Sequence, residues 1–174
     1  MNRLARASIY LAVLAFAIPL LAQEPAHVRH KPRVSQSALL NQDLGEMVVE
    51  AALNTHRWDY YGFDCSHFVQ AVFGAVGLPF QYANSIKLYK GAEEFRRVLH
   101  PQPGDLIVWQ GHVGIVVDPE EHSFYSMLRS GLRLSTYDSP YWKARGRTRF
   151  LRYAAPPALR LRAVKMARLQ SASR

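Results

Sequence analysis

The sequence is poor in cysteine and in acidic residues. It contains one cysteine, Cys65, so no disulfide can form within the chain. Its 13 Asp and Glu residues face 22 Lys and Arg residues, which gives a formal net charge of +9 at pH 7. This excess favours anionic partners such as acidic peptides, wall polymers or membrane surfaces.

The sequence lacks several motifs that are typical of metal sites, serine hydrolases or phosphate-binding proteins. There is no HxH, HExxH or CxxC arrangement, which argues against a zinc site. There is also no GxSxG nucleophile elbow and no glycine-rich loop of the kind that holds phosphate groups. We therefore expect neither a metal nor an organic cofactor.

The N-terminus has the layout of a secretory signal peptide. Arg3 and Arg6 precede an apolar run over residues 9–22, which is shorter than the roughly 20 residues of a membrane-spanning helix. Small Ala22 offers a cleavage point, and an uncleaved anchor is the alternative. The segment predicts export to the periplasm or the extracellular cell envelope, where nucleic acid is not an expected partner.

The remaining chain divides into three parts by composition. Residues 23–36 mix proline, histidine and basic residues and predict a flexible linker, and residues 37–155 form the expected domain. The tail over residues 156–174 carries five basic residues and no acid. It is suited to contact a membrane surface or an anionic polymer, although a basic helix without such a role fits equally well. A monomer is the default expectation.

Helical periodicity dominates the first half of the domain. An apolar stripe predicts a helix that begins after a capping Ser37, and a second stripe predicts a helix from Cys65 that is closed by Gly77 and Pro79. Short helical pieces are expected on either side of Gly91.

Strand signals dominate the second half. The segments LIVW, HVGIVV, SFYSML and LRLST lie between Gly, Pro and Asp turn residues, which predicts an antiparallel meander. SPYW predicts one further helical turn, and TRFLRYA a closing strand. Helices followed by strands indicate an α+β domain, with N-terminal helices packed on an antiparallel β-meander.

Cys65 is the candidate nucleophile. The apolar stripe places it on the inner face of the first turn of its helix, where free backbone amides and the helix dipole favour a thiolate and can bind an oxyanion. This position predicts a lowered thiol pKa and fast alkylation near neutral pH. An inert buried cysteine is the alternative.

His112 is the candidate general base among seven histidines. It begins the HVGIVV strand, and alternation places His112, Gly114 and Val116 on one face of that strand. Gly114 suggests open space beside the imidazole, so a helix packed across this face would bring Cys65 to His112. The alternative is a structural histidine.

The segments GFDCSHFVQAVF and PGDLIVWQGHVGIVV together resemble the paired motifs of the NlpC-type cell-wall cysteine peptidases, over roughly residues 37–153. The resemblance implies a papain-like fold and attack by Cys65 on a peptide carbonyl through a thioester, with His112 as the base. It also implies a peptidoglycan stem peptide as substrate, without a cofactor.

The sequence departs from the family pattern at the site. His67 stands where the family has glycine, and the segment before the cysteine is shorter than usual. The residue that orients the base, commonly a histidine in the family, aligns with Ser126, which alternation places on the same face as His112. His122, a backbone carbonyl or water are the alternatives for this role.

We therefore expect an exported peptidoglycan endopeptidase or amidase with Cys65, His112 and Ser126 as its catalytic residues. An acyltransferase that uses the same Cys-His pair is one alternative. The other is a wall-binding domain with weakened catalysis, because serine supplies no charge to the imidazole.

Overall fold

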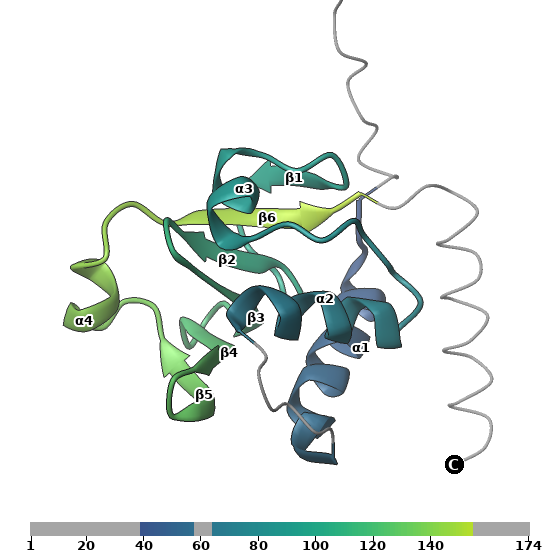
Figure 1. Ribbon diagram of the computed structural model, residues 1–174, viewed down its shortest axis with the longest axis horizontal. Coiled ribbons are helices and arrows are strands. Elements are labelled where there is room, and N and C mark those ends of the chain that lie inside the picture. The colour runs from purple at the N-terminus through teal and green to yellow at the C-terminus, as the bar shows by residue number, and fades with distance from the viewer. Residues whose placement is uncertain (1–38, 58–63, 155–174) are drawn as a thin grey trace, which may run out of the picture. The chain divides into compact units, whose positions relative to one another are not determined.

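The computed structural model describes residues 39–57 and 64–154, which contain both halves of the expected domain (Figure 1). The predicted signal peptide, the predicted linker and the basic tail lie outside these residues. None of the described helices is long and apolar enough to cross a membrane. The helices are α1 (Gln42–Leu53), the 3-10 turn η2 (Asn54–Arg57), α2 (Cys65–Ala75), α3 (Ser85–Lys90) and α4 (Pro140–Lys143).

Helix α1 begins later than the apolar stripe predicts. Its N-cap is Asn41, whose Oδ1 accepts a hydrogen bond from the Leu44 N–H at 3.3 Å. Ser37 lies outside the described residues, and residues 39–41 precede the helix. An asparagine cap satisfies an amide that no helical carbonyl can reach, and this fixes the start at Gln42.

The strands form one six-stranded antiparallel sheet in the order β1-β6-β2-β3-β4-β5. The predicted meander is present as β2 to β5, and the predicted closing strand β6 is inserted between β1 and β2. The strands are β1 (Phe95–Val98), β2 (Leu106–Trp109), β3 (His112–Asp118), β4 (Ser123–Leu128), β5 (Gly131–Thr136) and β6 (Arg149–Tyr153). The α+β class is confirmed.

Strand β1 corrects one expectation of the sequence. The helical piece predicted before Gly91 is present as α3, but the piece predicted after it is wrong, since β1 pairs with β6 there. Phe95 is buried at 4% exposure, and its ring packs against Phe73 and Tyr153. These long-range contacts decide the conformation of a segment with weak local preference.

The sheet has two covered faces. Helices α1 and α2 lie together on one of them (Figure 1), where Phe68 and Val69 belong to the same core as Val113 and Ile115 of β3. A second cluster forms from the residues that alternate with these, with Trp142 of α4 packed on it. Its buried members are Ile107, Trp109, Val116, Phe124 and Trp142.

The PGDL segment before β2 connects the helices to the sheet. A Cβ on Gly45 of α1 would lie 2.1 Å from the Pro103 carbonyl oxygen, and a Cβ on Gly104 would lie 2.5 Å from the Gly45 oxygen. Gly104 also has a φ of +81°, which disfavours any side chain. The glycine inside α1 is therefore required by a backbone contact.

We expect Gly45→Ala to lower the free energy of unfolding by at least about 2 kcal/mol, because its Cβ meets backbone that cannot rotate away. Gly74→Ala in α2 is the matched control, since nothing lies within 4 Å of that Cβ. It should stabilise the protein by about 0.5–1 kcal/mol, the usual gain of alanine over glycine in a helix. Urea denaturation measures both variants, and equal effects would disprove the close contact.

Candidate active site

Cys65 occupies the first position of α2, as the sequence predicts. The preceding Asp64 caps the helix, and its Oδ1 accepts hydrogen bonds from the backbone N–H groups of Ser66 and His67, each at 2.9 Å. The Cys65 side chain is partly buried and packs against the core on the α1 and α2 side of the sheet. The cap holds the cysteine at the helix start and occupies the Ser66 and His67 amides, while the Cys65 backbone N–H lies beside the sulfur.

The thiol reaches the beginning of β3. Burial raises the pKa of Cys65, and hydrogen bonding from the Val113 backbone and the Ser66 side chain offsets part of this effect. The pairing of β3 with β4 runs only from Ile115 to Asp118, so the backbone around Val113 lies before that ladder. The structure thus places the sulfur against the residue that follows His112.

The direction of this pKa differs from the sequence expectation. A helix start favours a thiolate, but a partly buried sulfur loses hydration that the charged form needs. The raised pKa of Cys65 keeps the thiol protonated at neutral pH in the free protein. Attack by sulfur therefore requires a base that removes the proton as the new bond forms.

His112 is buried at 7% exposure and is held by Ser126 of β4. Its Nε2 lies 3.0 Å from the Ser126 hydroxyl oxygen, so the hydrogen bond expected between these two side chains is present. Ser126 is itself fully buried. This contact leaves Nδ1 as the ring nitrogen available to a proton from outside the pair.

The arrangement of helix and strand faces corrects the predicted geometry. Helix α2 packs on the face of β3 that carries Val113 and Ile115, and not on the face of His112. The imidazole instead lies among the aromatic rings of the second cluster. The Cys65 sulfur lies at the backbone of Val113, at the start of β3, and not across the face that carries the His112 side chain.

Gly114 also has a different role from the one its sequence suggests. A Cβ at this position would lie 2.6 Å from the Phe124 ring and 3.0 Å from the Ser126 Cβ. The space beside Gly114 is therefore filled, not open. The absent side chain lets β4 bring Ser126 within hydrogen-bonding distance of His112.

The environment of His112 keeps its ring neutral. Burial, and then the positive charge of Arg145, lower the pKa of His112 to about 4. At neutral pH the imidazole is therefore unprotonated and able to accept a proton, which is the form that a general base requires. The resting pair consists of a neutral thiol and a neutral imidazole.

A second group of side chains lies at the helix start beside the cysteine. The His67 ring stacks on Tyr82 with centroids 4.4 Å apart, and His67 Nδ1 lies 3.0 Å from Asp64 Oδ1. Burial, then the negative charges of Asp64 and of a Cys65 thiolate, raise the pKa of Tyr82. Sequence reasoning missed Tyr82, because only folding brings the segment after α2 back to the cysteine.

His122 does not take part in this site. It lies at the turn between β3 and β4, where its Nδ1 is 3.3 Å from Asp138 Oδ2. Its side chain is 50% exposed, and its φ of +53° is left-handed. In the described residues, the side chain that shares a hydrogen bond with the His112 ring is Ser126. Within residues 39–57 and 64–154, no three His, Cys, Asp or Glu side chains form a metal-binding group.

Comparison with known families identifies the domain that carries this site. Residues 51–149, more than half of the chain, match the model of the NlpC/P60 family. The chain belongs to the NlpC/P60 family. Members of this family are generally cysteine peptidases or amidases that act on peptidoglycan peptides. No curated protein matches the chain.

The NlpC/P60 match includes all three predicted site residues, Cys65, His112 and Ser126. It also includes the aromatic side chains that surround His112. The family relation therefore indicates a cell-wall peptidase or a related function for this domain.

Proposed function

We propose that this NlpC/P60 domain is an exported, papain-like cysteine hydrolase that cleaves peptide or amide bonds in peptidoglycan stem peptides. One observation carries the proposal: the Cys65 sulfur lies at a capped helix start against the backbone of Val113, and the residue before Val113 is a neutral His112 held by Ser126. A nucleophile, a base and a group that orients the base are the parts that such a reaction needs.

The reaction begins with proton transfer coupled to sulfur attack. His112 Nδ1 accepts the Cys65 proton as the sulfur adds to the substrate carbonyl, and the backbone N–H of Cys65 donates to the developing oxyanion. Nε2 keeps its hydrogen and donates it to the Ser126 hydroxyl oxygen. The imidazolium then protonates the leaving amine, and a thioester remains.

The thioester is resolved by water. His112, neutral again, removes a proton from the attacking water molecule, and collapse of the intermediate returns the thiol and releases the acid product. Ser126 provides a hydrogen bond without negative charge, so it stabilises the imidazolium less than a carboxylate would. No step needs a metal or an organic cofactor.

Export fits this substrate. The signal-peptide pattern over residues 1–22 would deliver the enzyme to the periplasm or the extracellular envelope, where peptidoglycan lies. Residues 23–174 carry 20 basic and 13 acidic residues, and this net charge of +7 favours an acidic wall substrate. The basic tail over residues 156–174 adds a contact for an anionic polymer or membrane surface. The enzyme acts as a monomer without nucleic acid.

Digestion of purified muropeptides by residues 23–174, read by mass spectrometry, tests this function. We expect a product with a new carboxylate and one added water per cleaved bond. Added amine acceptors separate the rivals, since an acyltransferase forms amide products with them. Binding of wall fragments without release of any product would instead identify a wall-binding domain and overturn the hydrolase.

We expect Ser126→Ala to lower kcat/KM on muropeptides about tenfold, the usual effect of losing one hydrogen bond that orients a catalytic group. His122→Ala is the control, because His122 pairs with Asp138 outside the site. It should leave kcat/KM within about twofold of the parent. The assignment of Ser126 fails if His122→Ala costs more activity than Ser126→Ala.

A further inference from the structure

The imidazole of His112 is covered by an aromatic ring from another part of the chain. Trp142, from α4, lies with its ring centroid 4.8 Å from that of His112, and the two rings are tilted by 34°. Trp142 is 4% exposed and packs in turn on Trp109, at 4.7 Å. The second cluster thus closes over the face of the base.

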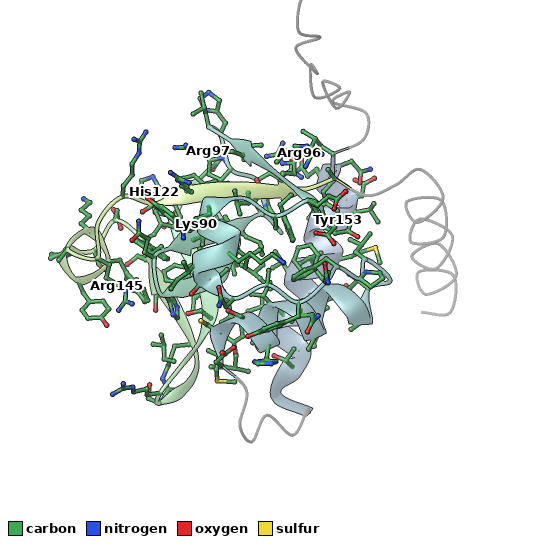
Figure 2. All side chains as sticks on the ribbon, turned by 45° about the horizontal axis from the view of Figure 1, so that its top comes forward. Lys90, Arg96, Arg97, His122, Arg145 and Tyr153 are labelled. Carbon is green, nitrogen blue, oxygen red and sulfur yellow. The ribbon has the colours of Figure 1, made fainter. Side chains whose placement is uncertain are left out.

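A charged side chain lies on the same tryptophan. The Arg145 guanidinium carbon is 5.3 Å from the Trp142 ring centroid, and Arg145 Nη1 donates a hydrogen bond of 3.2 Å to the Tyr141 hydroxyl. The Arg145 backbone N–H also donates to the Trp142 carbonyl at 3.2 Å. Figure 2 shows Arg145 at the α4 end of the domain, and Arg97 on β1.

The other elements around His112 bring little charge to it. Strand β2 contributes Trp109 and strand β4 contributes Ser126, and neither side chain is ionised near neutral pH. On β5, Arg133 pairs with Ser126 in the sheet register, and its side chain is exposed to solvent. The Cys65 thiol lies at Val113, on the start of the same strand. Among the described residues, Arg145 is the charged side chain that lowers the pKa of His112, after the larger effect of burial.

We propose that Trp142 and Arg145 are positioning residues for the base. Trp142 holds the His112 imidazole in place and excludes water from it, and Arg145 keeps the imidazole unprotonated. This inference rests on the proposed function, because it assigns the base of that reaction. The inference means that α4 and the residues after it help to set the protonation state of His112, which the uncharged Ser126 cannot do.

The physical reason lies in what each contact does to the two forms of the ring. Trp142 excludes water, and this disfavours the charged imidazolium. A guanidinium beyond the indole ring repels a second positive charge, and because Arg145 is exposed, solvent and salt weaken this repulsion. Because Ser126 cannot offset this repulsion with a negative charge, the ring rests in its neutral, proton-accepting form.

Titration of His112 by NMR tests the proposed effect of Arg145 on the His112 pKa, and it needs no measurement of enzyme activity. It is measured in the full chain carrying Cys65→Ala, where no turnover takes place. Arg145→Gln should raise the pKa of His112 by about 0.5 unit, and added salt should narrow the difference. Arg97→Gln removes the same charge from β1 and should leave the titration unchanged. An unchanged pKa in Arg145→Gln overturns the role of Arg145.

Kinetics on muropeptides test the positioning part. Trp142→Leu should lower kcat about tenfold with KM within about twofold, and Trp142→Phe should restore most of the loss, because a ring again covers the imidazole. Equal loss in both variants, or a change in KM alone, overturns the role of Trp142. If the parent cleaves no substrate while the Arg145→Gln titration shifts, the proposed function fails and the electrostatic inference stands.

Discussion

Cys65→Ala is expected to lower kcat/KM on muropeptides by at least about 10³-fold, because covalent catalysis needs the sulfur and no other group can form the thioester. What remains should be the small rate enhancement that substrate binding and oxyanion donors give by themselves. Mass spectrometry of timed digests measures the loss against the parent chain.

Two variants separate chemistry from folding in this experiment. Cys65→Ser preserves shape and a hydroxyl nucleophile, but a neutral imidazole of low pKa is a poor base for an alcohol, so its activity should stay close to that of Cys65→Ala. Because Cys65 lies at the edge of the core, both variants should keep a cooperative thermal transition within a few degrees of the parent. Full activity of Cys65→Ala would refute the mechanism.

Arg152→Ala is expected to lower the free energy of unfolding by about 3–5 kcal/mol, because it leaves a buried carboxylate without its cation. Asp105 has no exposed surface, and its Oδ2 accepts a hydrogen bond of 2.8 Å from Arg152 Nη2. Arg152 Nε donates to Asp105 Oδ1 at 2.9 Å, and Arg152 Nη2 donates also to the His100 carbonyl. The pair connects β6 to the PGDL segment.

The stability cost of Arg152→Ala should depend on pH, because the charge of Asp105 does. Burial raises the pKa of Asp105, and Arg152 opposes that shift. Without Arg152, the pKa of Asp105 in the folded state lies further above its value in the unfolded state. Below the unfolded-state pKa the carboxyl is protonated and its burial costs the variant little. As pH rises through the folded-state pKa, the carboxyl must ionise while buried, and the folded variant loses stability. The cost of Arg152→Ala should therefore be larger at pH 7 than at pH 4.

Denaturation with urea at both pH values measures this effect. Arg97→Ala is the control on β1, since Arg97 is exposed, and it should change stability by less than about 0.5 kcal/mol. The double change Asp105→Leu with Arg152→Met removes both charges and should recover much of the lost stability. A loss below about 1 kcal/mol for Arg152→Ala at pH 7 would contradict the buried pair.

The local elements of the fold followed from the sequence where two signals agreed. Helix α2 has an apolar stripe, a capping Asp64 and a terminating Gly77 with a φ of +75°. Strands β2 to β5 have turn residues at both ends, and all four are present. In each case the local preference of the chain and its burial in the folded state point to the same structure.

The expectations that failed had two causes: partners distant in the chain, and a local cap that the apolar stripe does not show. The segment after Gly91 has weak local signals, and pairing with β6 makes it a strand. The apolar stripe extended α1 to Ser37, but the helix begins at its asparagine cap. Gly45 is an unfavourable residue for a helix interior in the sequence, and only the fold shows that the Pro103 carbonyl leaves no room for a side chain there.

The places of Cys65 at the start of α2 and of His112 at the start of β3 were predictable from the sequence, since a helix start and a strand start are local features. Their surroundings were not. The thiol pKa was expected to fall, but partial burial raises it, and the depth of a side chain depends on which helix lies on which face of the sheet. The contact of Trp142 with His112 and that of Arg145 with Trp142 also required the fold.

By itself, the sequence determined that a lone cysteine begins an amphipathic helix, that a histidine begins a strand, and that Ser126 shares the His112 face. These properties depend on the order of residues within one helix or strand, and the spacing of apolar residues along the chain indicates them directly. Only the tertiary structure decided that α2 covers the opposite face, that Gly114 admits Ser126 and that α4 encloses the imidazole. Contacts between distant segments depend on how whole elements pack, and no local pattern encodes them.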